Sequence, residues 1–206
     1  MCEQDLPMLP HSCRHCAQIL PGQSLSLSMA CGACLKNPPA IDQTYALFSY
    51  QPPIAQCIIR LKFQQQLTYA ETLGKYLAKK IQNTWYHSQL LPDLILPVPL
   101  HRKRLQERGY NQALEIARPI AKQLHLPIDI HGITRHKHTK AQSELQAHER
   151  KENLAGAFCA HHEYTGLSIA IVDDVMTTAH TVFELGKLLK QQGAKQVVVW
   201  CCARTQ

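Results

Sequence analysis

The sequence predicts an α/β protein in which helices flank a parallel sheet, preceded by a small zinc-ribbon-like module. Three observations support this. Strand-like apolar segments alternate with helical patterns over residues 41–206, which is typical of parallel sheets covered on both faces. Residues 168–172 form a nearly continuous apolar run, as a central strand requires. Four clustered cysteines lie in residues 1–40, which show little helical periodicity. We therefore expect two units, 1–40 and 41–206.

Length, charge and hydropathy narrow the class of protein. A chain of 206 residues suits one main core with a small appendage. The net charge of +7 gives a positive field that would attract polyanions, although charge alone does not separate nucleic-acid binding from simple solubility. The first residues resemble no secretory signal, and no run approaches the roughly 18 apolar residues of a membrane span. We expect a cytoplasmic protein without a transmembrane segment.

Two cysteine pairs predict a metal site. Cys13 and Cys16 form one C-x-x-C pair, Cys31 and Cys34 form another, and 14 residues separate them. Each short pair directs two thiolates at one ion, so two pairs complete a tetrahedral zinc site. Four thiolates leave no open position, so we expect a structural zinc ion and little Lewis-acid chemistry.

Two other interpretations of the cysteines stay open. A neighbouring histidine, His11 or His15, could replace one ligand, and C-x-x-C is also a redox motif. Two pairs in one short module favour metal. The remaining cysteines lack ligand spacing, and the last three of them, in strand-like runs, are expected to be buried packing residues; these are Cys2, Cys57, Cys159, Cys201 and Cys202.

The elements of residues 41–206 follow from periodicity and from turn residues. After the prolines at 52 and 53, Ile54, Ile58 and Leu61 lie on one face of a helix. A polar segment, 135–153, has no apolar face and is expected to form a mobile flap. Gly193 is the expected helix stop. The predicted strands are 45–50, 93–99, 168–172 and 196–201, and the further helices are 69–85, 111–124 and 182–191.

The most informative segment is IVDDVMTTAHT, at residues 171–181. A helix that begins at the carboxyl end of a parallel strand offers unpaired N–H groups and a positive dipole to phosphate. Thr177, Thr178 and Thr181 add hydroxyl donors, and Asp173 and Asp174 can accept hydrogen bonds from ribose hydroxyls. The segment therefore predicts a sugar-phosphate site. The simpler alternative, a capped helix after a buried strand, explains one threonine but not the acidic pair.

This segment resembles the phosphoribosyl-pyrophosphate signature of type I phosphoribosyltransferases. The resemblance implies that Asp173 and Asp174 are catalytic, that Mg²⁺ accompanies the pyrophosphate, and that the 5′-phosphate is bound by Thr177, Thr178, Ala179, His180 and Thr181. The signature commonly has glycine where this chain has Ala179. A methyl group there would hinder a positive φ or a close backbone approach to phosphate, so we expect Ala179→Gly to tighten binding.

A basic segment follows the strand at 93–99. It runs from Pro97 to Ala113 and contains Arg102, Arg104, Arg108 and Gly109. We predict a loop whose guanidinium groups bind an anion, with Gly109 permitting close backbone approach; that the anion is pyrophosphate or DNA is implied by the family resemblance described next. A solvated charge run is the competing interpretation.

The Arg-Gly-aromatic-Asn-Gln run around Gly109, the cysteine module and the acidic-threonine turn together resemble the ComF/GntX family over most of the chain. The resemblance implies a type I phosphoribosyltransferase-like domain and a hood in which Lys140 and Arg150 clamp an anion. It also implies action on single-stranded DNA in natural transformation. The implied partners are a DNA-uptake helicase at the inner face of the inner membrane and proteins that receive the incoming strand.

Two functions therefore remain open. A binding protein would hold single-stranded DNA and phosphoribosyl pyrophosphate, with Tyr110, Trp85 or Tyr86 available to stack bases, although we expect Trp85 and Tyr86 in the core. An active phosphoribosyltransferase, in nucleotide salvage or in a GntX-like metabolic role, would need an acceptor base, for which the sequence contains no hallmark.

Overall fold

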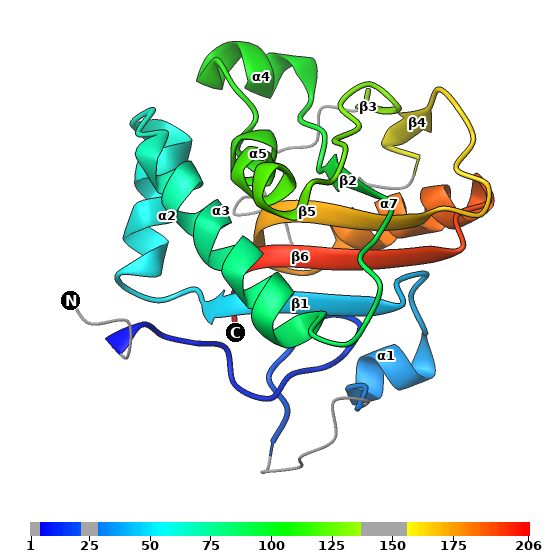
Figure 1. Ribbon diagram of the computed structural model, residues 1–206, viewed down its shortest axis with the longest axis horizontal. Coiled ribbons are helices and arrows are strands. Elements are labelled where there is room, and N and C mark those ends of the chain that lie inside the picture. The colour runs from blue at the N-terminus through cyan, green and yellow to red at the C-terminus, as the bar shows by residue number, and fades with distance from the viewer. Residues whose placement is uncertain (1–4, 22–28, 137–155) are drawn as a thin grey trace.

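A four-stranded parallel sheet forms the centre of the molecule (Figure 1). The computed structural model describes residues 5–21, 29–136 and 156–206. The strand order is β1-β6-β5-β2, and every pairing is parallel. The strands are β1 (Gln43–Ser49), β2 (Leu94–Pro97), β5 (Ser168–Met176) and β6 (Gln196–Arg204). The predicted α/β class with a parallel sheet is therefore correct.

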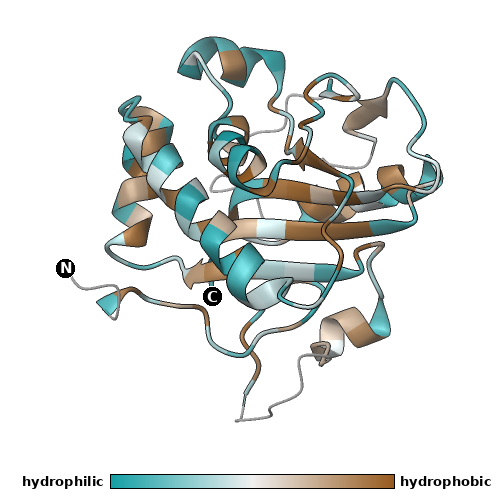
Figure 2. Ribbon diagram, in the orientation of Figure 1, coloured by the Kyte–Doolittle hydropathy of each residue, from teal (hydrophilic) through white to brown (hydrophobic). Residues whose placement is uncertain are grey.

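Helices cover both faces of this sheet (Figure 1). The helices α2 (Ile54–Phe63), α3 (Thr68–Lys80) and α5 (Gln112–Leu124) pack on one face, and α7 (His180–Gln191) packs on the other. Successive residues of β6 point to opposite faces: Val199 joins the α7 side of the core and Trp200 joins the other. Burial on both faces explains why the central strands are apolar without alternation, as their colour in Figure 2 shows.

The remaining elements include a short helix, a π-helical turn and a second, two-stranded sheet. In the N-terminal part, α1 (Gly32–Lys36) lies beyond strand β1 (Figure 1). A π-helical turn, η2 (Ile81–Trp85), continues α3, so the predicted helix 69–85 changes geometry at Lys80. A short antiparallel pair, β3 (Ile133–Arg135) and β4 (Phe158–Ala160), lies apart from the main sheet. None of the helices in the described ranges is long and apolar enough to cross a membrane.

Three local predictions need correction. The basic segment predicted as a loop contains a helix, α4 (Arg102–Arg108). Strand β5 continues past Val172 to Met176, so both aspartates belong to the strand. Cys159 was expected to be buried, but it is exposed because it occupies the outward-facing position of the short strand β4. Most of the predicted flap, 137–153, lies outside the described residues.

Two of the helices on this face of the sheet, α3 and α5, are positioned by specific contacts. At Gly74, α3 approaches α5 so closely that an added Cβ would lie 2.5 Å from the Ile116 carbonyl oxygen. Asn111 begins α5: its Oδ1 accepts from the Ala113 N–H at 3.0 Å, and its Nδ2 donates to the Val98 carbonyl at 3.0 Å. These contacts hold the start of α5 at the carboxyl end of β2.

Candidate functional site

The acidic-threonine segment spans the junction between β5 and α7. Asp173 and Asp174 occupy the end of β5, Thr177 and Thr178 form the following turn, and α7 begins at His180. Ala179 is the N-cap residue and adopts a left-handed conformation with φ of 60°. This conformation favours glycine, so Ala179 holds an unfavourable backbone geometry at the turn.

The two aspartates have different surroundings. Asp174 is 7% exposed, and its Oδ2 lies 2.6 Å from the Lys62 Nζ on α2. Although burial alone would lower the pKa of Lys62, the Asp174 carboxylate raises it. Asp173 lines a cavity, and burial together with the charge of Asp174 raises its pKa well above the ordinary value. The pair therefore consists of one ion-paired carboxylate and one that resists ionisation.

A cavity of about 700 Å³ brings the two predicted anion-binding segments together. It lies at the carboxyl ends of the strands, where α/β proteins bind ligands. The sequence-predicted residues among its lining are Asp173, Asp174, Thr177, Thr181, Arg104 and Arg108. Lys62 from α2 and Arg135 from β3 also line it, and no sequence motif predicted a role for either of them.

Positive charge is concentrated in this cavity. Burial, with the nearby charge of Arg108, lowers the pKa of Arg104. Burial, with the nearby charge of Arg104, lowers the pKa of Arg135 to about 10. The guanidinium of Arg108 lies over the Phe63 ring, 5.5 Å from its centroid, and donates to the Gln112 Oε1 at 2.8 Å. Mutual repulsion among partly desolvated guanidinium groups favours the binding of an anion beside them.

Helix α4 determines which arginines face this cavity. The helix starts where the His101 Nδ1 accepts from the Lys103 N–H at 3.2 Å, and it ends at Gly109, whose φ is 79°. Arg104 and Arg108 are four residues apart and share one face. Arg102 and Gly109 instead line a neighbouring cavity of about 520 Å³. The helix therefore divides the predicted pyrophosphate residues between two cavities.

Other predicted residues lie beside the cavity or outside the described part. Thr178, Ala179 and His180 belong to the turn and to the first residue of α7, but they are absent from the cavity lining. The Thr178 hydroxyl oxygen is buried and has no hydrogen-bond partner among the described residues. Lys140 and Arg150 lie outside the described residues.

The aromatic residues differ in their surroundings. Trp85 stacks on Tyr45 with ring centroids 4.8 Å apart, and Tyr86 meets Trp200 edge-on at 5.8 Å. As predicted, both pack against the core. Tyr110 lines the 520 Å³ cavity, and its hydroxyl donates to the Leu61 carbonyl.

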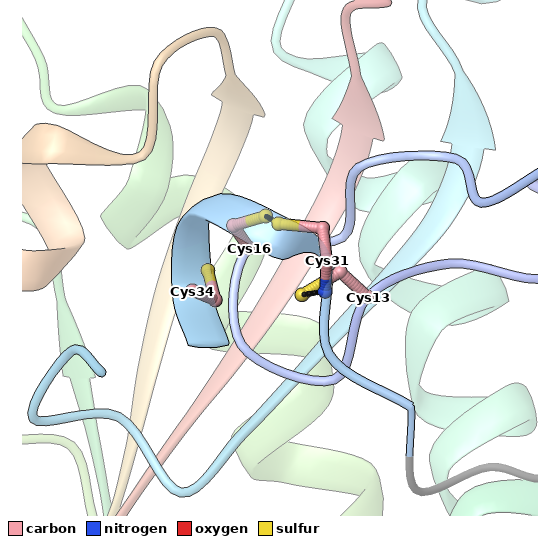
Figure 3. Close-up of side chains that lie close together, drawn as sticks. All are labelled: Cys13, Cys16, Cys31 and Cys34. Atoms are coloured by element: carbon pink, nitrogen blue, oxygen red, sulfur yellow. Dashed lines mark hydrogen bonds between the residues drawn. The ribbon is translucent and has the colours of Figure 1, made fainter. Parts of the chain in front are cut away.

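The four predicted zinc ligands converge (Figure 3). The sulfur atoms of Cys13, Cys16, Cys31 and Cys34 all lie within 4.8 Å of one another, and those of Cys16 and Cys31 are 3.7 Å apart. A tetrahedral zinc site with Zn–S bonds of about 2.3 Å has sulfur–sulfur edges of about 3.8 Å. The cluster therefore has the dimensions of a four-thiolate metal site.

Local structure favours the thiolate form of Cys13 but not that of Cys16. The Cys31 N–H donates to the Cys13 sulfur at 3.2 Å, at the start of α1. Burial would raise the pKa of Cys13, but backbone N–H donors, that of Cys31 foremost, lower it to about 7. Burial raises the pKa of Cys16 to about 12. A bound cation would favour the deprotonated form of every member.

The chain is similar to known proteins over most of its length. The model of the phosphoribosyl transferase domain matches residues 111–205. "DNA utilization protein YhgH" of Escherichia coli K12 is 37% identical over 86% of this chain and 78% of that protein. "Competence protein F" of Haemophilus influenzae is 35% identical over 98% of this chain and 88% of that protein.

A solved purine phosphoribosyltransferase from Pyrococcus horikoshii is 19% identical, with a TM-score of 0.40, over 68% of this chain and 74% of that chain. The assignment rests on the curated relatives, whose identity of more than a third extends over most of both chains, and on the matched domain. On these grounds, this chain belongs to the ComF/GntX family and contains a phosphoribosyltransferase domain.

Proposed function

We propose that this protein is a ComF-like competence protein that acts in the uptake and processing of transforming single-stranded DNA and binds phosphoribosyl pyrophosphate. The observation that carries the proposal is the 700 Å³ cavity, in which an acidic pair and a threonine turn face a group of basic side chains. The names of the relatives, "Competence protein F" and "DNA utilization protein", support the DNA pathway.

The proposed ligand would lie between α7 and α4. The 5′-phosphate would meet the N-terminus of α7 with the hydroxyls of Thr177 and Thr181. Since Lys62 already holds Asp174, Asp173 is the carboxylate we assign to the ribose hydroxyls. The pyrophosphate would be bound by Arg104 and Arg108, whose planar guanidinium groups suit phosphate.

Divalent metal would enter with the ligand. Mg²⁺ takes oxygen ligands and is usually bound by one or two carboxylates together with substrate phosphates. Asp173 lines the cavity beside the proposed pyrophosphate position, and the charge of a bound Mg²⁺ would offset the burial that raises its pKa, so that its oxygens could serve as ligands. The ion would neutralise phosphate charge there.

Single-stranded DNA would contact α4 through its phosphates. The helix has basic groups on both sides, with Arg104 and Arg108 on one cavity and Arg102 on the other. Residues 1–40 are the proposed zinc module, and Lys140 and Arg150 are proposed to complete the anion site. A DNA-uptake helicase at the inner face of the inner membrane and the proteins that receive the strand are the proposed partners.

Isothermal titration of phosphoribosyl pyrophosphate in the presence of Mg²⁺ tests the sugar-phosphate site. We expect Arg104→Ala and Thr181→Val each to weaken binding about tenfold, the loss of roughly one charge-assisted hydrogen bond. Lys103→Ala is the matched control, because Lys103 is an exposed cation on the same helix and is absent from both cavity linings. A wild-type protein that binds no phosphoribosyl pyrophosphate would refute this part of the proposal.

The DNA role has separate tests. Fluorescence anisotropy should show single-strand binding that weakens with salt, and Arg102→Ala combined with Arg104→Ala should lower the salt dependence by about two charges. In a naturally transformable host, loss of the gene should reduce transformation by added DNA and leave growth intact. Unchanged transformation would favour nucleotide salvage or a GntX-like metabolic role.

A further inference from the structure

Arg204 is a buried cation that joins the cysteine cluster to the turn at Thr177 and Thr178. Because this turn is the proposed phosphate site, it is called the phosphate turn below. It is the last residue of β6 and is only 6% exposed. In the register of the sheet it is opposite Met176 of β5 on one side and Ser49 of β1 on the other. Its side chain therefore starts at the carboxyl ends of three strands.

On one side, the guanidinium binds the cysteine module. Its Nε donates to the Cys16 carbonyl oxygen at 2.9 Å, and its Nη2 donates to the Gln18 Oε1 at 3.1 Å. Cys16 supplies one of the four clustered sulfur atoms. The position of this acceptor therefore depends on how the Cys16 thiolate is held.

On the other side, the same guanidinium binds the phosphate turn. Its Nη1 donates to the Met176 carbonyl oxygen at 3.1 Å and also to the Thr177 carbonyl oxygen. Thr177 lines the 700 Å³ cavity, as does Thr205, whose carbonyl oxygen accepts from Nη1 at 2.6 Å. One planar group thus positions the backbone at the point where β5 ends and the turn begins.

Because these acceptors are uncharged, the position of the Arg204 guanidinium depends on each of its hydrogen bonds. Among the described residues, Arg204 donates hydrogen bonds to uncharged oxygens of the backbone, of Gln18 and of Thr205. A buried guanidinium without a carboxylate depends on having its donors satisfied. Because the group is planar and rigid, displacement of the Cys16 carbonyl would tilt it away from Thr177.

We propose that Arg204 is a positioning residue that couples metal occupancy of the cysteine cluster to the phosphate turn, so that the zinc-loaded protein binds phosphoribosyl pyrophosphate more tightly. The effect on the affinity for phosphoribosyl pyrophosphate rests on the proposed function. The mechanical link, by which we mean the hydrogen bonds from Arg204 to Cys16 and to Thr177, does not. Coupling of this kind is reciprocal, so the sugar phosphate must also raise the affinity for zinc. We expect about a tenfold effect, within the usual range for coupled sites.

The first experiment measures the affinity of zinc-loaded protein for phosphoribosyl pyrophosphate by calorimetry, with metal content determined on each sample. We expect Arg204→Met to retain one zinc per chain and to bind about tenfold more weakly. Arg204→Lys keeps the charge but has fewer donors, so it should be intermediate. Gln18→Leu removes one acceptor while Arg204 stays in place, and it provides a milder change in the same direction. Arg118→Met, at an exposed position on α5, is the control.

The second experiment isolates the coupling. Zinc affinity is measured by competition with a chelating dye, with and without phosphoribosyl pyrophosphate, for wild type and Arg204→Met. The ligand should raise the zinc affinity of wild type, and this gain should be lost in the variant. Any direct chelation of zinc by the ligand is the same in both titrations and cancels in the comparison. Equal gains in both proteins would overturn the coupling.

The third experiment needs no ligand. Hydrogen exchange should be faster at the Thr177 and Thr178 amides in zinc-loaded Arg204→Met than in wild type, and exchange in α3 should be unchanged. If wild type binds no phosphoribosyl pyrophosphate but exchange at the turn rises, the proposed function fails and the mechanical link stands. If wild type binds the ligand but the variant is unchanged in affinity and exchange, the link is refuted and the function stands.

Discussion

The cysteine cluster and the 700 Å³ cavity are two sites of opposite charge, and they are built in opposite ways. The cluster gathers four potential anions from two short sequence pairs and buries three of them. The cavity gathers Lys62, Arg104, Arg108 and Arg135 from three separate elements and remains open to ligand. In the first site, a bound metal ion would cancel the repulsion between thiolates, and its binding free energy would stabilise the fold. In the second, a bound anion would reduce the repulsion among the guanidinium groups, and such repulsion in the free protein is an ordinary cost of a preorganised binding site.

Removing one of the proposed metal ligands should have the largest effect. Cys34→Ser takes one thiolate from the cluster, and we expect loss of the bound zinc and a fall in thermal stability of more than about 10 °C, because structural zinc contributes directly to folding free energy. Metal analysis and thermal unfolding check this prediction. Cys159→Ser is the control, since Cys159 is exposed and outside the cluster. A Cys34→Ser protein that keeps one zinc per chain would show that the cluster is not the metal site.

In the cavity, loss of the Lys62 ammonium should have the next largest effect. Lys62→Met leaves Asp174 buried without its partner, and breaking a buried pair in this way costs about 3–5 kcal/mol. The solvent exposure of Lys62 favours the lower end of that range. Denaturant unfolding measures the loss. Lys75→Met is the matched control, because Lys75 pairs with Glu71 at the same 2.6 Å on the surface. If both variants lost a similar amount of unfolding free energy, the buried pair would contribute no more than the exposed one, contrary to this prediction.

Asp173 should make the stability depend on pH. Its pKa is raised in the folded state by burial and by Asp174, so folding is most favourable when this carboxyl is protonated and becomes less so as pH rises through the folded pKa. We expect Asp173→Asn to raise the unfolding free energy at pH 8 by about 1 kcal/mol, a typical gain when function no longer constrains a site. The gain should vanish as pH falls toward the ordinary carboxyl range near 4. Unfolding of both proteins across this range tests the sign, with Glu71→Gln as an exposed control. A gain that grows on acidification would contradict it.

Ala179→Gly should have the smallest effect on stability. Relief of the left-handed conformation at φ of 60° favours the variant, while the added freedom of the unfolded chain opposes it, so we expect a net gain of about 1 kcal/mol or less. Calorimetry on the same samples should show tighter binding of phosphoribosyl pyrophosphate. Unchanged affinity would show that the Ala179 methyl group does not hinder the ligand.

The spacing of residues was enough to predict the parts of the molecule that are local in sequence. The two C-x-x-C pairs predicted the converging sulfur atoms, because each pair confines its ligands within one short turn. The continuous apolar run before Asp173 predicted a strand covered on both faces. The predicted apolar face of α2 is confirmed, since Ile54, Ile58 and Leu61 are all buried.

Predictions failed where the direction of a side chain or a distant partner mattered. The density of charge in the basic segment suggested a loop, but the His101 cap and the left-handed Gly109 allow a short helix between them. Once that helix forms, its rotation per residue separates Arg102 from Arg104 and Arg108. No local signal marked Lys62 or Arg135, because neither follows a motif and each reaches the cavity only through packing.

The sequence by itself determined the α/β class, the set of converging cysteines and the acidic-threonine turn, since periodicity and short-range spacing are properties of a few consecutive residues. The tertiary structure alone decided that Lys62 pairs with Asp174, that Arg135 joins the cavity, and that Arg204 binds both Cys16 and Thr177. Those contacts join residues from 27 to 188 positions apart, and their geometry exists only after the strands have paired and the helices have packed against them.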